Sequence, residues 1–299
     1  MAARRDLSGR ILLVTGATRG CGLHGALAWQ RLGAEVVVGA RSRERYEEVA
    51  GQFAAGSVHP FVADLAEPAS IGPALAELAS RGIRPTDLVH CASAGLEPIL
   101  RPLMRAVVAL RRLAPGPDLA AGLEEQKEVL GRLVEENRSL AFRVNFESPR
   151  ELTARLGPVL PEGGRVIAYS SVWATASEDG QCPTFYGGIA ASKLAFERWL
   201  EAESPTQVRP SVLVGHIIGD TQTAAFIDRH LTPLMSEADQ ALFRAAYAAT
   251  EEITAAASGI LLDGSPDPGR LRRVYVIGGR PVGETIEPDV VAVAGRMPL

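Results

Sequence analysis

The sequence predicts an α/β fold, a Rossmann-like doubly wound seven-stranded parallel sheet with helices on both faces. Short apolar runs alternate with longer amphipathic stretches along the 299 residues, which is typical of repeated β–α units. Several of these runs are apolar throughout, as expected for strands that are covered on both faces. A glycine-rich turn follows the first run, and the length fits a single domain over residues 1–299.

The expected elements follow from these runs in chain order. Strands are predicted at residues 10–15, 35–40, 58–63, 87–92, 165–170, 210–215 and 273–278. Helices are predicted between them at residues 20–32, 42–54, 69–81, around 123–157, 187–203 and 250–262.

Two stretches are longer than a crossover helix requires. Residues 96–125 are interpreted as an insertion, and residues 221–250 mix apolar and charged side chains at helical spacing. Long ordered insertions often carry function, so we expect 221–250 to form a helical substrate lid. The alternative is a helix that serves packing or dimerisation.

Composition excludes several classes of function. A net charge of −4 gives no basic footprint for nucleic acid. The three cysteines are far apart in sequence, which indicates reduced intracellular thiols and no zinc site, so no metal is expected. The first apolar run is too short for a signal sequence or a membrane span. We expect a cytoplasmic protein without nucleic-acid or membrane partners; its oligomeric state is left open.

The segment LLVTGATRGCG predicts a dinucleotide site. Its glycines, Gly16, Gly20 and Gly22, follow a strand and open a helix, where the backbone can approach a pyrophosphate at the positive helix end. Three glycines alone are a weak signal, but here they lie in a repeating β–α chain.

The second strand favours NADPH over NADH. Where an NAD enzyme usually presents an acid to the ribose, this chain has Arg41 and Ser42, with Arg19 in the glycine loop. Guanidinium groups suit a 2′-phosphate, whereas a carboxylate would repel it. The alternative is that Arg41 is a solvated surface residue.

Residues 15–22 resemble the T-G-x-x-x-G-x-G motif of the short-chain dehydrogenase/reductase family, and further motifs extend the resemblance along nearly the whole chain. The resemblance implies a cofactor site that includes Thr18, Cys21, Asp64 and Leu65 at the adenine end, Cys91, Ala92 and Ser93 along the cofactor, and Thr221 at the nicotinamide carboxamide. It also implies catalytic roles for Asn145, Ser171 and Lys193, with Lys193 on the ribose. Thr221 could instead cap a helix.

The catalytic tyrosine of that family is missing. Four residues before Lys193, where the family has tyrosine, stands Ile189, which has no proton to give. Tyr186 is seven residues before Lys193, about 10 Å of helical rise away, and Gly187-Gly188 suggest that the helix begins after it. Three readings stay open. Tyr186 serves as the acid, a phenol of the substrate supplies the proton, or the domain binds the nucleotide without catalysis.

The expected function follows from these departures. They resemble those of atypical polyketide ketoreductases within the family, which implies an NADPH-dependent ketoreductase acting on a bulky aromatic, angucyclinone-like ketone. The competing interpretation is a non-catalytic NADP(H)-binding regulator. His216, just after the sixth strand, is a weaker candidate for a proton donor, because a lone histidine is more often structural.

Overall fold

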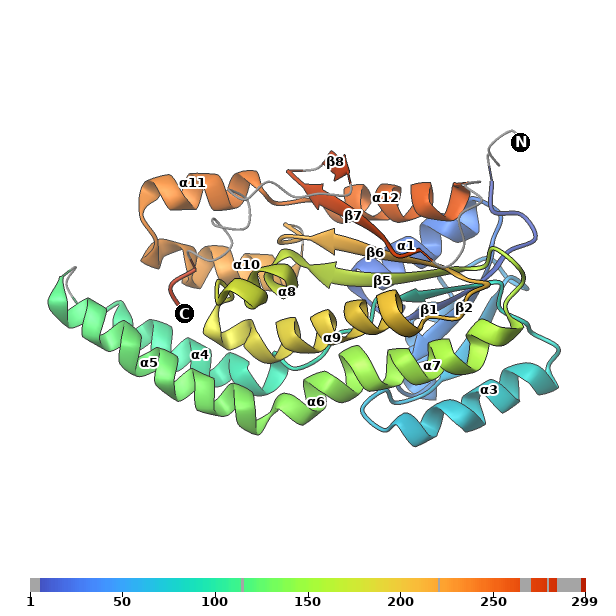
Figure 1. The fold of residues 1–299 in the computed structure, drawn as a ribbon, viewed down its shortest axis with the longest axis horizontal. Helices are drawn as coiled ribbons and strands as arrows, with labels where there is room; N and C mark the ends of the chain where they lie inside the picture. The colour runs from blue at the N-terminus through green and yellow to red at the C-terminus, as the bar shows by residue number, and fades with distance from the viewer. Residues whose placement is uncertain (1–5, 114–115, 220, 264–269, 279, 284–296) are drawn as a thin grey trace.

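In the computed structural model one sheet organises the chain (Figure 1). Residues 6–113, 116–219, 221–263, 270–278, 280–283 and 297–299 are described. The strands are β1 (Ile11–Thr15), β2 (Glu35–Ala40), β3 (Val58–Val62), β4 (Asp87–His90), β5 (Arg165–Ser171), β6 (Arg209–Gly215), β7 (Arg272–Ile277) and β8 (Arg280–Gly283). Their order is β3-β2-β1-β4-β5-β6-β7-β8. Successive strands are added on one side of β1 up to β3 and on its other side from β4 on, which defines a doubly wound sheet.

The seven predicted parallel strands are confirmed, each within two residues of its predicted ends. The sheet has one strand more than predicted, because β8 pairs antiparallel with the edge of β7. A four-residue strand without an apolar run gives no periodic signal, so its pairing was not visible in the sequence.

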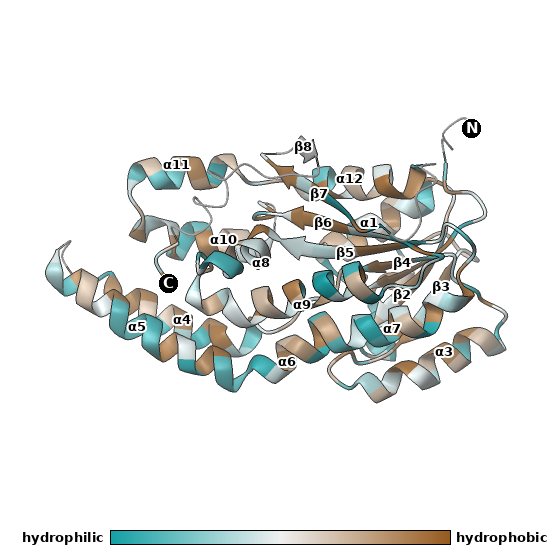
Figure 2. Ribbon diagram, in the orientation of Figure 1, coloured by the Kyte–Doolittle hydropathy of each residue, from teal (hydrophilic) through white to brown (hydrophobic). Residues whose placement is uncertain are grey.

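Helices cover both faces of the sheet. They are α1 (Gly20–Arg31), α2 (Arg43–Ala50), α3 (Ile71–Ser80), α4 (Glu97–Leu110), α5 (Pro117–Glu136), α6 (Arg138–Phe142), α7 (Ser148–Leu156), α8 (Val172–Ala176), α9 (Gly187–Glu203), α10 (Gln222–His230), α11 (Glu237–Ala245) and α12 (Thr250–Leu262). Buried side chains of α1, α2 and α12 join one apolar cluster, and those of α3, α7 and α9 join the other. The strands between the two clusters are strongly hydrophobic (Figure 2), as a sheet buried on both faces requires.

The long helix predicted around 123–157 is interrupted. It consists of α5, α6 and α7, with a π-helical turn at Arg143–Glu147 between α6 and α7. A π-turn inserts one extra residue and is frequent at functional sites. Asn145 lies in the middle of this turn, which sets its direction relative to the sheet.

The predicted insertion at 96–125 holds α4 and the first part of α5; residues 114–115 lie outside the described part of the chain. These two helices lie side by side and extend beyond the sheet (Figure 1). Residues 221–250 form α10 and α11, so they are helical as expected. Whether 221–250 acts as a lid stays a prediction.

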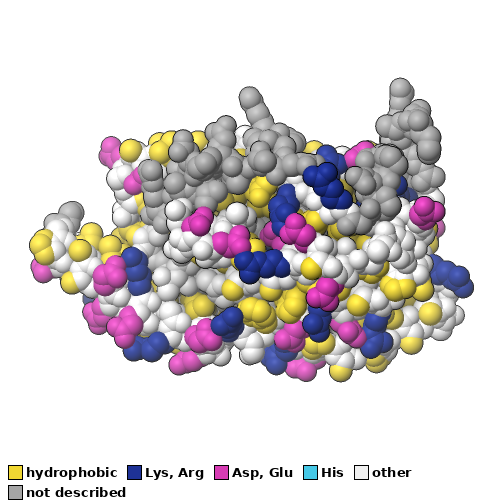
Figure 3. All heavy atoms as spheres, viewed as in Figure 1, with side chains coloured by type: hydrophobic (Ala, Val, Ile, Leu, Met, Phe, Trp, Pro, Cys, Tyr) yellow, Lys and Arg dark blue, Asp and Glu magenta, His cyan; other side chains and the backbone are white. Residues whose placement is uncertain are grey.

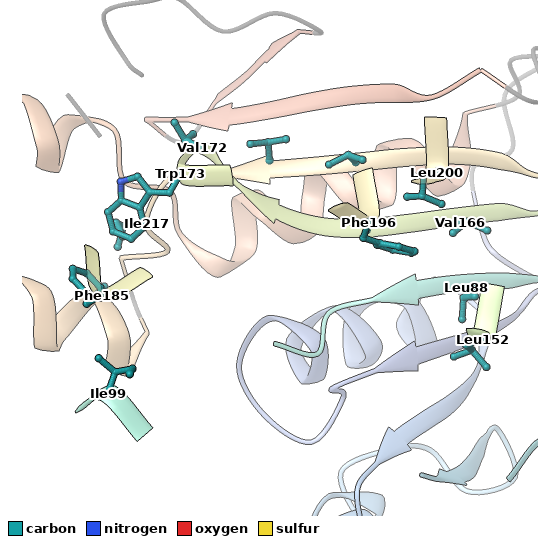
Figure 4. Packing of buried hydrophobic residues seen from close by; sticks show 14 of the residues in the cluster. Leu88, Ile99, Leu152, Val166, Val172, Trp173, Phe185, Phe196, Leu200 and Ile217 are labelled. Carbon is teal, nitrogen blue, oxygen red and sulfur yellow. The ribbon is translucent and has the colours of Figure 1, made fainter. Parts of the chain in front are cut away.

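The apolar packing leads directly to the strand ends. Figure 4 shows Phe196 and Leu200 of α9 against the sheet, and Trp173 beyond the end of β5. On the face shown in Figure 3, acidic and basic side chains are interspersed, without a large area of one charge. Within the described residues, no helix has both the length and the apolar character needed to cross a membrane.

Candidate functional site

The glycine loop between β1 and α1 is shaped by close backbone contacts. A Cβ atom on Gly16, whose φ is +67°, would lie 2.7 Å from the Cα of Ala92. A Cβ on Gly22 would lie 2.4 Å from the carbonyl oxygen of Gly16. A Cβ on Gly20, in contrast, would meet no atom within 4 Å, so the loop faces open space there. This close-packed loop at the start of a helix fits the pyrophosphate of a dinucleotide.

The residues after β2 offer a cation for a phosphate. Arg43 pairs with Glu77 at 3.2 Å, and Arg45 pairs with Glu48 at 2.7 Å. Arg41 is exposed and forms no ion pair with a described residue. Of these three arginines, Arg41 is therefore the one whose guanidinium is available to a ligand such as a 2′-phosphate.

Two other predicted residues of this region already have partners. Ser42 caps α2 by accepting a hydrogen bond from the backbone N–H of Arg45 at 3.4 Å. Arg19 in the glycine loop is 83% exposed and lies 3.7 Å from Glu97. An exposed ion pair of this kind is worth little, so it does not prevent Arg19 from turning to a phosphate.

The residues predicted for the adenine end, Asp64 and Leu65, lie in the turn after β3. Asp64 is exposed, and one of its carboxylate oxygens accepts from the backbone N–H of Ala66 at 2.9 Å. The carbonyl of Leu65 accepts from Ser148 of α7 at 2.8 Å, which fixes the backbone of the turn. The second Asp64 oxygen stays accessible for an amino group.

The segment after β4 lines the same edge of the sheet. Ala92 donates its N–H to the hydroxyl of Thr15 at 3.3 Å, and the Cβ of Cys91 lies 3.2 Å from where a Cβ on Gly22 would be. Ser93 is exposed. Thr18 and Cys21, also expected at the cofactor, are half-buried in the loop and at the start of α1.

Asn145 fixes the loop after β4 to α9. Its amide accepts from the N–H of Ala94 at 3.1 Å and donates to the carbonyl of Ala94 and to Ser192, both at 3.0 Å. No hydrogen bond joins Asn145 to Lys193 directly. The π-turn thus places Asn145 against Ser192, the residue before Lys193 in α9, and connects it to the backbone of Ala94.

Lys193 lies under the end of β5. Its ammonium donates to the carbonyl oxygen of Tyr169 at 2.7 Å. Burial lowers the pKa of Lys193 to about 8, although the carboxylate of Glu197, one turn later on α9, opposes this shift. Two of the three ammonium protons are left for other acceptors, which fits a ribose diol.

Ile189, which stands where the sequence resemblance implies a tyrosine, is buried. It is 4% exposed, and its side chain packs 3.1 Å from where a Cβ on Gly95 would lie. The position one turn before Lys193 is therefore filled with packed hydrocarbon and has no proton donor.

Tyr186 lies beside Ser171. The helix α9 begins at Gly187, as Gly187-Gly188 suggested, and Tyr186 ends a short 3₁₀ turn before it. Burial raises the pKa of Tyr186 strongly, and a hydrogen bond with Ser171 opposes that shift. Lys193 is not among the groups that shift this pKa. The phenol thus reaches the serine hydroxyl without the lysine activation that the family's tyrosine receives.

Ser171 and Thr221 both cap helices. Ser171 is 5% exposed and accepts from the N–H of Trp173 at 3.2 Å at the start of α8. Thr221 accepts from the N–H of Ala224 at 3.2 Å and donates to the carbonyl of Ile218 at 2.7 Å. The only proton of Thr221 is therefore used within the protein, which leaves it to act on a carboxamide as an acceptor.

Sequence reasoning missed two residues of this site. Glu197 is buried, accepts from Ser170 of β5 and lies 3.5 Å from Arg273 of β7. Tyr169 of β5 lies beside Cys91, and burial and the Cys91 thiol raise its pKa. The spacing of Glu197, four residues after Lys193, was the available signal for the first. The position of Tyr169 beside Cys91 could be recognised only once the sheet had placed β5 next to the segment after β4.

The comparisons with known proteins concern the fold and residues 10–105. Residues 10–105 match the model of the short chain dehydrogenase family. A search of curated proteins found no match.

Solved structures match over nearly the whole chain. A short chain dehydrogenase from Salmonella enterica serovar Typhi CT18 has 20% identity and a TM-score of 0.62, with 91% of this chain and 99% of that one covered. A protein described as a probable short chain dehydrogenase from Shigella flexneri 2a, complexed with NADP, has 19% identity and a TM-score of 0.62, with 90% and 99% covered. A gluconate 5-dehydrogenase from Burkholderia cenocepacia J2315, in complex with NADP and tartrate, has 19% identity and a TM-score of 0.60, with 92% and 96% covered. The chain therefore has the fold of the short-chain dehydrogenase/reductase superfamily of oxidoreductases, with that family's sequence pattern in residues 10–105.

Proposed function

We propose that this protein is an NADPH-dependent ketoreductase that acts on a bulky aromatic, angucyclinone-like ketone. The observation that carries the proposal is the arrangement at the end of β5. Lys193 and Ser171 both lie there, Tyr186 contacts Ser171, and Ile189 fills the place of the usual acid.

NADPH is the proposed cofactor because the residues present fit it. The glycine loop has room for a pyrophosphate at Gly20, and Arg41 has no acidic partner among the described residues. Lys193 would hold the nicotinamide ribose. The Shigella and Burkholderia proteins of the same fold were solved with NADP. Bound NADPH would supply the hydride for the carbonyl carbon.

The protein's residues would orient the ketone and hold its oxygen. Ser171 is the donor available to that oxygen, and Tyr186 keeps the serine hydroxyl in place. Since Ile189 cannot give a proton, we propose that a phenol of the substrate, hydrogen-bonded to the carbonyl, protonates the new alkoxide. The resulting phenolate is stabilised by resonance and regains a proton from water, so that the charge balances.

A second proton source has one observation in its favour. Tyr186 is the phenol that reaches Ser171, and a phenol with a raised pKa can still protonate an alkoxide. In that case Tyr186 would replace the family's tyrosine from outside α9.

The test is NADPH oxidation with two matched ketones. In 8-hydroxy-1-tetralone the phenol is hydrogen-bonded to the carbonyl, and in 8-methoxy-1-tetralone it is blocked. Turnover of the hydroxy ketone alone supports proton donation by the substrate. Equal turnover of both overturns it in favour of a protein acid. NADPH binding without oxidation by either ketone, or by larger phenolic ketones, would instead support a nucleotide-binding regulator.

A further inference from the structure

A group of aromatic side chains lies beyond the ends of β5 and β6. We call Trp173, Tyr186, His216, Phe243 and Tyr247 the aromatic cluster. Ring centroids are 4.8 Å apart for Trp173 and Tyr186, 5.9 Å for Trp173 and His216, and 4.7 Å for His216 and Phe243. Tyr247 completes the cluster at 5.6 Å from Phe243.

The cluster is continuous with the proposed catalytic site. Ser171 pairs with Gly215 in the sheet register, so His216 follows directly after the residue beside Ser171. Tyr186 connects the two from the other side, because it contacts both Ser171 and Trp173. A flat molecule whose carbonyl lies at Ser171 would extend into this cluster.

His216 is the unsatisfied polar group in the cluster. It is 7% exposed, and neither Nδ1 nor Nε2 has a hydrogen-bond partner among the described residues. The other deeply buried histidine, His90, is bonded through Nε2 to Thr153 at 3.0 Å, so that only its Nδ1 has no partner among the described residues. Buried polar atoms without partners cost stability and are rare in folded proteins. Two on one ring indicate a group that is satisfied by something other than the described residues, such as a bound ligand.

The state of His216 defines what it can bind. Burial lowers its pKa to about 4, so the ring is neutral at neutral pH. A neutral imidazole has one N–H donor and one acceptor nitrogen. It can therefore bond a hydroxyl in either direction and can donate to a quinone or carbonyl oxygen.

The helix α11 can make room for such a ligand. Phe243 is the one buried side chain of α11, and its neighbour Leu242 is 49% exposed. The pair Arg244–Asp228, at 2.9 Å, joins α11 to α10 on the surface. Displacing the Phe243 ring would therefore withdraw a single buried side chain of α11 from the core.

We propose that His216 is a substrate-recognition residue, which bonds a second oxygen on a planar aromatic substrate whose ring replaces Phe243 in the aromatic cluster. The aromatic nature of the substrate rests on the proposed function. Trp173 and Tyr247 provide faces for stacking, and Ser171 holds the first oxygen. The substrate class is thus a fused aromatic ketone with a hydroxyl or quinone oxygen on the ring remote from the reacting carbonyl.

The experiment measures binding, so that it does not depend on turnover. The protein is saturated with NADP⁺, and 8-hydroxy-1-tetralone and 6,8-dihydroxy-1-tetralone are titrated by calorimetry. Since a buried hydrogen bond that replaces an unsatisfied group is worth about tenfold in affinity, we expect the wild type to bind the dihydroxy compound about tenfold more tightly.

The variant His216→Phe keeps a ring of similar shape and removes both nitrogens. It is expected to reduce the preference to below about threefold and to raise Tm, because an unsatisfied buried group is removed. His216→Asn, which keeps a donor and an acceptor, should retain part of the preference. A wild type without preference, or a preference unchanged in His216→Phe, would overturn the role of His216. If the wild type prefers the dihydroxy compound but neither tetralone is reduced by NADPH, the proposed function would be overturned and the role of His216 in binding would stand.

Replacement of the Phe243 ring is tested separately. Phe243→Ala removes the ring that must be displaced and should strengthen binding of both tetralones, whereas the exposed neighbour variant Leu242→Ala should leave binding unchanged. If Phe243→Ala binds both compounds no better than Leu242→Ala does, the ligand does not take the place of this ring.

Discussion

The candidate site has two halves, one proposed to bind the nucleotide and one proposed to bind the substrate. They differ in how closely their sequences match the short-chain dehydrogenase pattern. The half formed by β1, β2 and β4 has its glycines, its strand order and its loop contacts in the family pattern, and the family model matches this part of the chain. The half formed by β5, α9 and the helices beyond them has Ser171 and Lys193 where the sequence resemblance implies catalytic residues, and the buried Ile189 where it implies a tyrosine. Binding of the cofactor depends on backbone geometry, which tolerates few side chains, whereas the chemistry beyond it can be supplied by different groups.

The largest loss of nucleotide binding is expected when a side chain is added at the closest backbone contact of the glycine loop. In Gly22→Ala the new Cβ would lie 2.4 Å from the carbonyl of Gly16, so the loop must move. We expect NADPH binding at least about 100-fold weaker, since backbone shifts of this kind cost roughly 3 kcal/mol. Fluorescence titration measures it. Gly51→Ala, where a Cβ meets no atom within 4 Å, is the matched control and should bind as the wild type does.

A second substitution tests whether the protein prefers NADPH to NADH. Arg41→Ala removes the guanidinium that has no acidic partner, and NADPH affinity should fall about 10- to 100-fold, as for the loss of a charge-assisted hydrogen bond. NADH affinity should be unchanged. Arg45→Ala, which removes an arginine already paired with Glu48, is the control. Equal losses for NADPH and NADH would remove the case for a phosphate clamp.

The lysine that joins the two halves should make binding depend on pH. Because the Lys193 pKa is about 8, its positive charge is lost as pH rises through that value. NADPH affinity should therefore fall by about tenfold between pH 7 and pH 9.5 in the wild type, and should be weak and flat in Lys193→Met. Lys127→Met, which changes the other lysine, paired with Glu124 on the surface, should follow the wild-type profile.

The same shift affects stability in a defined direction. The pKa of Lys193 falls from 10.5 to about 8 on folding, so between these values the unfolded chain binds more protons than the folded protein. The contribution of Lys193 to the free energy of unfolding should therefore rise with pH across this window. Thermal unfolding of Lys193→Met and the wild type, compared from pH 7.5 to 10.5, isolates this term. A wild-type Tm that falls relative to Lys193→Met over this range would contradict it.

The two halves also differ in how well the sequence predicts them. The strands, α9 and α12 follow from local apolar periodicity, and their boundaries match closely. The glycine loop is equally local, because all its residues lie within one strand–turn–helix segment. In the substrate half, the contacts depend on how separate elements pack: Tyr186, just before α9, contacts Ser171 at the end of β5, and rings of α8 and α11 lie against His216. The spacing of residues along the sequence does not predict such contacts between separate elements.

The smallest expected effect decides whether the substrate phenol or Tyr186 supplies the proton. Tyr186→Phe removes the hydroxyl that contacts Ser171 and keeps the ring against Trp173. If the substrate phenol is the acid, turnover of 8-hydroxy-1-tetralone should fall by less than about tenfold, the value of one hydrogen bond that positions Ser171. Phe185→Leu, which alters the neighbouring ring without touching a hydroxyl, controls for packing.

A loss of several hundredfold in Tyr186→Phe alone would instead make Tyr186 the acid, since general acid catalysis contributes about 100- to 10,000-fold. The substrate half would then differ from the family in the position of its tyrosine and not in its chemistry.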